Sequence, residues 1–343
     1  MCPSQAQRWL NTTAYHWASI SGFRQCLPIP PCLPIWLKLD YESYATARLI
    51  QGHGKFCEIQ LFDESRIHAK KLANQLTAEV ARLEKKYSRF REDSFLSEIN
   101  SSAGNKLGIA IDDETQSLFD HALNCFEHSG GLFDISAGAL TEIWDFKKAL
   151  VPSQKQIDAT LGHVGLNKIS CNDSHIYLPQ NMQIDLGGIV KEYAADSVAR
   201  LARSLGVEHG LVNLGGDFSV IGSQPGNTPW AVGISSPIPE SGVMAKIDLT
   251  DGGLASSGDY ERFFMHKGLR YSHILNPITG WPSNGLRAVS IAANLCSVAG
   301  SATTIAMLKD ESGAKTWLEE SGLAYVYMDS EEKIGCDGLT SGS

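Results

Sequence analysis

Two pairs of adjacent glycines in this chain each lie beside an aspartate. Gly187-Gly188 follows Asp185, and Gly215-Gly216 precedes Asp217. A glycine pair at the end of an apolar element lets the backbone come close to a bulky anionic ligand. Tight turns would explain either pair without a ligand. The residues alone leave both interpretations open.

The elements that would position these glycines can be read from the pattern of apolar residues. The apolar run Ile184–Leu186 predicts a short strand before the first pair. A helix follows, with an apolar stripe at spacings of four, three and four, and Gly206 is expected to end it. Gly210–Ile221 then predicts two strands joined by the second glycine pair. The stripe consists of Ala194, Val198, Leu201 and Leu205.

Composition narrows the class of ligand. The chain has 343 residues, 43% of them hydrophobic, and a net charge of −9. It contains no run of basic residues, which argues against nucleic acid as a partner. An anionic ligand would then be held by glycine amides, a helix N-terminus or a metal ion. The eight cysteines are scattered and show no zinc-site spacing.

The first forty residues look different from the rest. Four prolines break the apolar stretch at 27–38, which is also too short to span a bilayer. No signal peptide or lipobox is visible, so the compartment stays open, with the cytoplasm as default. We expect residues 1–40 to form a poorly ordered arm, or to reflect a mis-assigned start codon, and residues 41–343 to form one domain.

Further elements follow from periodicity. Strands are expected from Phe56 and at 230–234, 243–249 and 288–293. Helices are expected around 72–83, 114–128 and 297–309. The segment 132–138 could wall a flat, ring-shaped ligand, with Asp134 offering acceptors, or could simply pack in the core. His273, ahead of an Asn-Pro turn, could be structural or catalytic.

Several motifs in order resemble one family, the bacterial ApbE-type FAD:protein FMN transferases, over about residues 48–330. The segment from Tyr87 to Asn100 fits the same family. The matching motifs are Gly131-Leu-Phe-Asp134, Asp185-Leu-Gly-Gly-Ile-Val-Lys-Glu-Tyr-Ala194, Val212-Asn-Leu-Gly-Gly-Asp217, Ser256-Ser-Gly-Asp-Tyr-Glu261 and His273-Ile-Leu-Asn-Pro-Ile-Thr-Gly280.

The resemblance implies a fold and an activity. The fold would be α/β (α+β), T-fold-like, with mixed sheets and flanking helices in one compact unit. The family splits the pyrophosphate of FAD, attaches FMN through its phosphate to a Thr or Ser hydroxyl of a target protein, and releases AMP. Mg²⁺ would neutralise the pyrophosphate. The partner would be an acceptor protein, for example a redox-pump subunit or a flavin reductase.

The resemblance also implies site residues. His273 would lie near the phosphates or the incoming hydroxyl, although His273, Asp217 and Asp259 all remain candidates for the base. Metal-binding positions would be Gly188, Gly300 and Thr304. Contacts to FAD are expected from Tyr87, Leu132, Phe133, Asp134, Asp185, Lys191 and Ile274.

The chain departs from the family pattern at several positions. Gly300 stands where the family has an aspartate, four residues before Thr304 on one helix face. Glu192 replaces a glycine, and Asn276 replaces an aspartate. The sequence Gly52-His53-Gly54-Lys55 replaces Ala-Met-Gly-Thr and could bring His53 or Lys55 near the nucleotide.

These departures leave three hypotheses open: a transferase with a weakened Mg²⁺ site, an accessory protein that binds FAD without transferring it, and a hydrolase that converts FAD to FMN and AMP. Substituting Gly300→Asp is expected to raise Mg²⁺ affinity and any transferase rate. Thr340, in a tail that faintly resembles an acceptor motif, could carry flavin, or the tail could be a frayed terminus.

Overall fold

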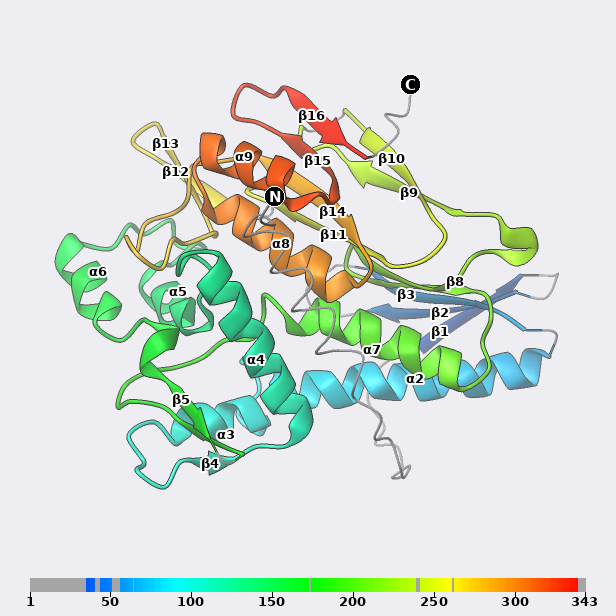
Figure 1. Ribbon diagram of the computed structural model, residues 1–343, viewed down its shortest axis with the longest axis horizontal. Helices are drawn as coiled ribbons and strands as arrows, with labels where there is room; N and C mark the ends of the chain where they lie inside the picture. Colours follow the sequence, from blue (N-terminus) through cyan, green and yellow to red (C-terminus); the bar gives the residue numbers. More distant parts are fainter. Residues whose placement is uncertain are drawn as a thin grey trace, which may run out of the picture.

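The computed structural model of the chain is shown in Figure 1. His53, Lys55 and Thr340 lie outside the described residues, as do the first thirty-four residues of the expected arm. Ile35–Asp40, which we assigned to that arm, instead forms strand β1. The structure describes residues 35–40, 44–50, 56–63, 65–172, 174–238, 241–260 and 262–338.

A nine-stranded sheet organises the molecule. Every strand in it runs antiparallel to its neighbours. In spatial order the strands are β1 (Ile35–Asp40), β2 (Tyr44–Ile50), β3 (Phe56–Phe62), β7 (Gly210–Leu214), β8 (Asp217–Gly222), β11 (Gly253–Gly258), β14 (Ala288–Ala293), β15 (Ala324–Met328) and β16 (Ile334–Asp337).

Helices cover one face of this sheet (Figure 1). α7 packs on β7 and β8, and α8 packs on β11 and β14, while α2 lies against α7. The apolar stripe of α2, which includes Leu72, Leu76 and Leu83, is almost fully buried. Burial of each such side chain stabilises the fold by about 1.5–3 kcal/mol. The helices are α2 (Arg66–Tyr87), α7 (Val190–Ser204), α8 (Cys296–Leu308) and α9 (Glu311–Ser321).

A β-hairpin covers part of the other face. β9 (Trp230–Ser235) pairs antiparallel with β10 (Val243–Leu249). Alternate residues of β9 are buried, as the period of a strand requires. Trp230 and its buried neighbours pack against Leu211, Val220 and Leu254 of the large sheet. The molecule is therefore layered as hairpin, sheet and helices.

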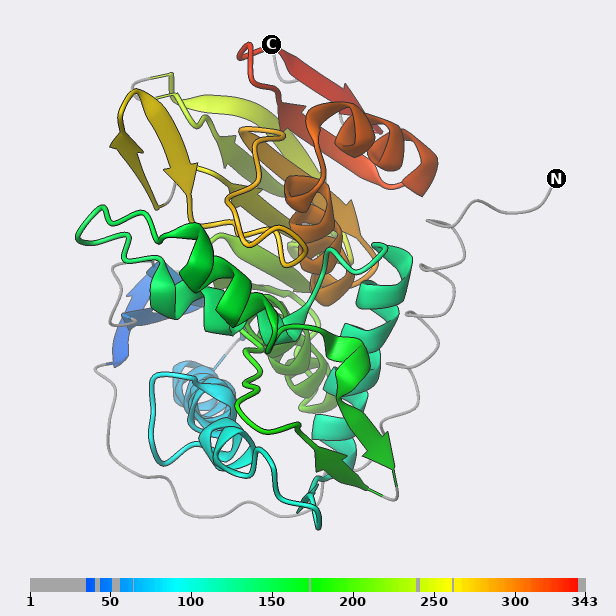
Figure 2. The same ribbon diagram turned by 90° about the vertical axis from the view of Figure 1, so that its left-hand side faces the viewer.

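Most of the remaining elements, those within residues 95–177, lie beyond the helix layer, coloured cyan to green below the yellow and orange segments in Figure 2. A two-stranded hairpin, β12 with β13, stands apart from the main sheet. The other elements are α3 (Phe95–Ser101), β4 (Ile109–Ala110), α4 (Asp113–His128), η1 (Ile135–Ala139), α5 (Leu140–Ile143), α6 (Gln154–Leu161), η2 (Leu166–Lys168), β5 (Ser170–Asn172), β6 (His175–Tyr177), η3 (Pro225–Asn227), β12 (Phe263–His266) and β13 (Leu269–Ser272).

The glycine-rich stretch folds largely as its pattern predicts. Gly215 and Gly216 both have positive φ, at 69° and 97°, and form the two-residue turn between β7 and β8. α7 ends before Gly206, which has a φ of 86°. The strand expected at Ile184–Leu186 is absent. The amide of Asn100 instead holds the backbone N–H and carbonyl of Ile184, so a side chain replaces a partner strand.

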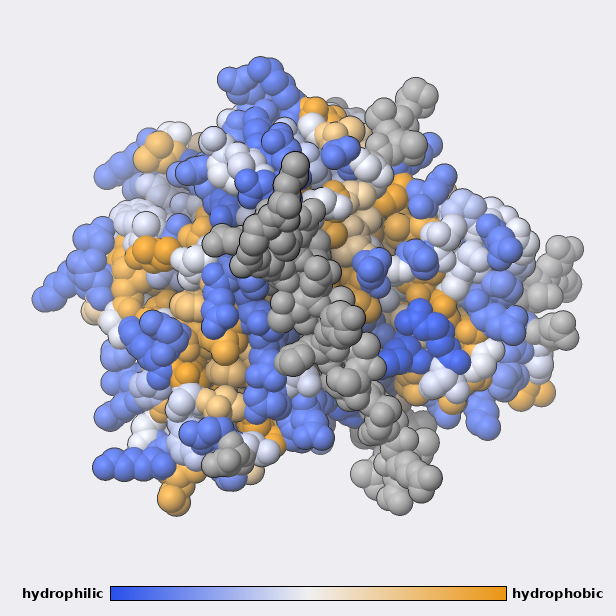
Figure 3. Space-filling view, viewed as in Figure 1, coloured by the Kyte–Doolittle hydropathy of each residue, from blue (hydrophilic) through white to orange (hydrophobic). Residues whose placement is uncertain are grey.

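The surface carries apolar side chains among polar ones. On the face seen in Figure 3, orange apolar groups alternate with blue hydrophilic groups. In the part of the chain that the structure describes, no helix has the length and apolar character needed to cross a bilayer.

Candidate functional site

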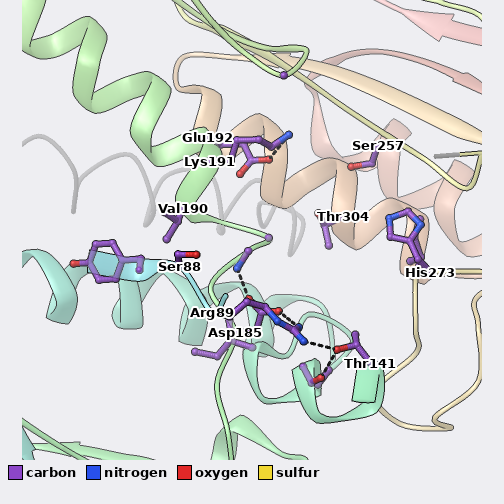
Figure 4. A pocket seen from close by; sticks show the side chains of 18 of the residues that line it. Ser88, Arg89, Thr141, Asp185, Val190, Lys191, Glu192, Ser257, His273 and Thr304 are labelled. Atoms are coloured by element: carbon purple, nitrogen blue, oxygen red, sulfur yellow. Dashed lines mark hydrogen bonds and ion pairs between the residues drawn. The ribbon is translucent and has the colours of Figure 1, made fainter. Parts of the chain in front are cut away.

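One cavity of about 910 Å³ opens between the helix layer and the segments beyond it. Its size suits a ligand of nucleotide dimensions. Its walls come from the C-terminal end of α2, residues 132–141, the start of α7, the end of β11, the loop after β13 and the second half of α8. Figure 4 shows side chains from these separate elements pointing toward the same space.

The fold brings nearly all the expected site residues to this cavity. Gly300 is the exception, because it does not line the cavity. Those that do are Tyr87, Leu132, Phe133, Asp134, Asp185, Gly188, Lys191, His273, Ile274 and Thr304.

Asp185 is fixed at the cavity wall by a closed set of hydrogen bonds (Figure 4). Its Oδ2 accepts from Nη1 of Arg89 at 2.6 Å, and its Oδ1 accepts from the N–H of Gly187 at 2.9 Å. Arg89 also donates to Oγ1 of Thr141 at 2.9 Å. A Cβ at Gly138 would lie 2.7 Å from the Cβ of Asp185, so only glycine fits there. The pairing of Arg89 with Asp185 has no local signal in the spacing of residues.

Asp134 and Tyr87 line the cavity, but their polar atoms are engaged elsewhere. Asp134 accepts hydrogen bonds from the N–H and hydroxyl of Ser136 and from the N–H of Leu166. The hydroxyl of Tyr87 lies 2.9 Å from Oγ1 of Thr115, a residue outside the cavity lining. Both residues therefore shape the wall, and Asp134 has less capacity to accept from a ligand than its sequence position suggested.

Cationic side chains reach the cavity although the sequence has no basic run, and four acids, Glu84, Asp134, Asp185 and Glu192, line it beside them. Arg89, Arg91, Lys191 and Arg262 line the same cavity from distant positions in the chain. The first turn of α7 also faces it, behind the exposed Gly187-Gly188 pair, and no side chain caps that helix. Such a helix N-terminus attracts phosphate groups. Sequence reasoning foresaw the glycine amides and missed the convergence of the arginines.

The three candidate bases are separated by the fold. His273 lines the cavity, and its Nδ1 lies 3.2 Å from the carbonyl oxygen of Arg262. A carbonyl can only accept, so Nδ1 carries the proton at this contact, and Nε2 of the neutral ring is the basic nitrogen. Asp217 is 1% exposed and ion-paired with Lys191. Asp259 pairs with Arg270 at 3.1 Å. Neither aspartate lines the cavity.

A buried charge cluster lies where α7 meets β8. The ammonium of Lys191 contacts the carboxylate of Asp217 and lies 3.6 Å from Oε1 of Glu192. Burial lowers the pKa of Lys191, but Asp217 and Glu192 together raise it above its ordinary value. Burial and the nearby Asp217 raise the pKa of Glu192, against the opposing effect of Lys191. The cluster contains two carboxylates and one ammonium.

Glu192 occupies the space that a side chain at position 300 would need. A Cβ built on Gly300 would lie 2.4 Å from Cγ and 2.9 Å from Cδ of Glu192. The expectation that Gly300→Asp alone would strengthen metal binding stays a prediction, and the new side chain would have to displace Glu192. Sequence reasoning noted both departures separately. Their coincidence, an acid lost at 300 and one gained at 192, was the signal that could have linked them.

The oxygen atoms near this point suit a hard divalent cation. Among the described residues, no group of three or more His, Cys, Asp and Glu side chains could hold an ion alone. Gly188, Glu192 and Thr304 line one cavity, and Oε2 of Glu192 is buried with no hydrogen-bond partner in the described part of the chain. A carboxylate, a hydroxyl and a backbone carbonyl leave coordination positions for phosphate oxygens. The residues present fit a magnesium ion shared with a diphosphate.

Comparison with known proteins gives a consistent result. The model of the ApbE family matches residues 53–327. The FAD:protein FMN transferase of Escherichia coli K12 is 31% identical over 71% of this chain and 72% of its own length. That of Treponema pallidum is 29% identical over 79% of this chain and 83% of its own.

Solved structures agree with the fold. The ApbE protein of Thermotoga maritima superposes with a TM-score of 0.76 and 29% identity, covering 89% of this chain and 97% of that protein. The flavin transferase ApbE of Vibrio cholerae, at 22% identity, has the same fold, with a TM-score of 0.72 over 90% of this chain and 98% of its own. The chain belongs to the ApbE family.

Proposed function

We propose that this protein is an FAD:protein FMN transferase that moves FMN from FAD to a threonine or serine hydroxyl of an acceptor protein. The proposal rests on one observation: a phosphate-binding feature and a candidate proton acceptor line the same cavity. An uncapped helix N-terminus with cationic side chains suits a diphosphate, and His273 on another wall suits a proton acceptor. The curated names of the Escherichia coli and Treponema pallidum relatives support the same activity.

The walls of the cavity suggest how FAD would bind. Leu132, Phe133 and Ile274 offer apolar contacts to a flavin ring, and Asp185 is held rigid by Arg89 for hydrogen bonding. The diphosphate would lie at the start of α7, near Lys191. Holding both ends of a long substrate fixes the position of its central phosphorus atoms, which is a large part of catalysis in phosphoryl transfer.

The reaction itself is an in-line displacement. The acceptor hydroxyl oxygen bonds to the phosphorus atom nearer riboflavin, and the bond from that phosphorus to the bridging oxygen breaks. AMP leaves with the bonding electron pair, and Nε2 of His273 takes the hydroxyl proton. Mg²⁺, when bound, neutralises charge on the diphosphate and on the departing AMP. The acceptor would be a redox-pump subunit, a flavin reductase or another protein with an exposed threonine.

Intact-mass measurement tests the proposal. The protein is incubated with FAD, Mg²⁺ and a threonine-bearing acceptor, and in parallel with the same acceptor carrying valine in place of that threonine. We expect a mass gain of one FMN on the threonine acceptor only, with one AMP released for each transfer. His273→Gln should slow transfer by about 10²–10⁴-fold.

Other outcomes would replace the proposal. Bound FAD with no AMP release would identify an accessory protein that holds flavin. Release of AMP and FMN without any acceptor would identify a hydrolase. Unchanged transfer by His273→Gln would remove that residue from its assigned role.

A further inference from the structure

We propose that Glu192 supplies the carboxylate ligand for the divalent cation, in place of the acid that position 300 lacks. The inference rests on the proposed transfer reaction, which needs a cation at the diphosphate. It adds a residue that the resemblance does not provide, since the family pattern has glycine at 192. The carboxylate would have moved from α8 to the facing helix α7 while remaining at the same point of the cavity.

The first support is the volume that Glu192 fills. The Cβ of any side chain at 300 would come within 2.4 Å of Cγ, 2.9 Å of Cδ and 3.2 Å of Oε1 of Glu192. The carboxylate of Glu192 therefore lies next to the place where an aspartate on Gly300 would begin. Thr304 follows Gly300 by four residues on α8, which puts it one turn along the same helix face.

The second support is that Glu192 is buried with an unused acceptor. Its side chain is 10% exposed, and Oε2 makes no hydrogen bond among the described residues. Buried carboxylate oxygens ordinarily have a partner, since an unpaired one is costly. Glu192 lines the cavity, so a ligand entering the cavity can reach it (Figure 4).

The third support is that neutralising Lys191 does not require Glu192. The ammonium of Lys191 is in direct contact with Asp217, whose Oδ1 also accepts from the N–H of Ser256. Oε1 of Glu192 is farther away, at 3.6 Å from the same ammonium. Asp217 alone therefore balances Lys191, and the carboxyl group of Glu192 is left available to another cation.

The test measures metal binding directly, because activity alone would not separate metal loss from other defects. Free Mn²⁺ is titrated by electron paramagnetic resonance, with and without FAD, for the parent protein, Glu192→Gln and the double variant Glu192→Gly/Gly300→Asp. We expect Mn²⁺ to bind the parent most tightly with FAD present, since phosphate oxygens complete the coordination. Glu192→Gln should weaken that affinity at least tenfold.

The double variant makes the test specific to the relocated carboxylate. It removes the side chain that fills the space beside position 300 and returns an acid to α8, so affinity should recover to within about threefold of the parent. Gly300→Asp alone should not raise affinity, because Glu192 occupies that space. Glu319→Gln, which removes an exposed acid of α9 outside the cavity, is the matched control for the charge change.

The outcomes that overturn the inference are distinct from failure of the proposed function. Parent-like Mn²⁺ affinity in Glu192→Gln overturns it, as does absence of Mn²⁺ binding by the parent with FAD. A folded double variant that stays as weak as Glu192→Gln also counts against it, with thermal melting used to establish folding. The proposed function fails separately if the metal binds as expected and the acceptor gains no FMN.

Discussion

Two buried carboxylates lie one turn apart on α7 and differ in every contact they make. Asp196 Oδ1 accepts from the hydroxyl of Ser219 and the N–H of Cys296, and its Oδ2 accepts from the N–H and hydroxyl of Ser297. It thereby binds the N-terminus of α8 to α7. Glu192 lines the cavity, and its Oε2 has no hydrogen-bond partner among the described residues.

The difference in hydrogen bonding indicates that Asp196 is structural, whereas Glu192 is available to a ligand. Four donors satisfy Asp196, so the contact between α7 and α8 is complete at that end. Nearer the cavity, the side chain of Glu192 packs beside Gly300 of α8 instead of meeting a set of donors. Departures from full satisfaction of buried polar groups are expected at functional sites.

The largest expected effect comes from removing the satisfied acid. Asp196→Ala should lower the free energy of unfolding by about 3–4 kcal/mol, because it leaves buried N–H and hydroxyl groups without acceptors. Glu192→Gln should change it by less than about 0.5 kcal/mol or raise it, since glutamine keeps the volume of the side chain and removes a buried acid. Urea denaturation of both variants measures the contrast. Equal losses would abolish the distinction between the two acids.

A pH effect should come from a second buried contact of α8, the one that it makes with α4. His121 of α4 is buried, with Nε2 2.8 Å from the hydroxyl of Ser301 on α8, and burial lowers its pKa to about 4. The unfolded chain takes up the proton near pH 6.5, whereas the folded chain resists it until about pH 4. The stability that neutral His121 provides is therefore complete above pH 6.5 and is lost as the pH falls toward 4.

The free energy of unfolding that is lost as His121 becomes protonated amounts to at most about 3 kcal/mol. It can be isolated by comparing the parent with His121→Gln, because other carboxylates titrate in both proteins. The difference in unfolding free energy between the two should shrink between pH 7 and pH 4. A constant difference would mean that His121 does not titrate in this range.

The smallest effect probes the contact between Gly300 and Glu192. Gly300→Ala should destabilise the parent by about 1 kcal/mol, since Glu192 must move, at a cost that outweighs the better helix propensity of alanine. In the Glu192→Gly background the same substitution should stabilise by about 1 kcal/mol. The double-mutant cycle over thermal or urea unfolding should therefore give a coupling of about 2 kcal/mol. Additive effects would show that the two positions do not compete for space.

Much of the fold was predictable because its signals are local. Periodicity located α4 and α8 to within one residue and found the apolar stripes of α2 and α7, and the paired glycines marked the turn between β7 and β8. The failures involve partners distant in sequence. Ile184–Leu186 has the pattern of a strand but is held by the side chain of Asn100, and no local signal records such a partner.

The site residues divide in the same way, into those marked by local motifs and those that depend on distant partners. Motifs brought Asp185, Lys191, His273 and Thr304 to one cavity, as expected, although what each does there stays a prediction. The pairing of Arg89 with Asp185 joins residues 96 positions apart, and the burial of Asp217 beneath Lys191 depends on the packing of α7 against β8. Both arise from tertiary structure, which residue spacing does not encode.

The contact between Glu192 and Gly300 has a consequence for how such chains change over generations. An acid introduced at 300 meets Glu192, and a glycine introduced at 192 removes the acid that lies beside Gly300. Each single step is unfavourable, so the two arrangements are separated by a barrier in sequence space. A sequence comparison that considers position 300 alone would find a metal ligand missing. A structural comparison would find a carboxylate from α7 in the space beside position 300.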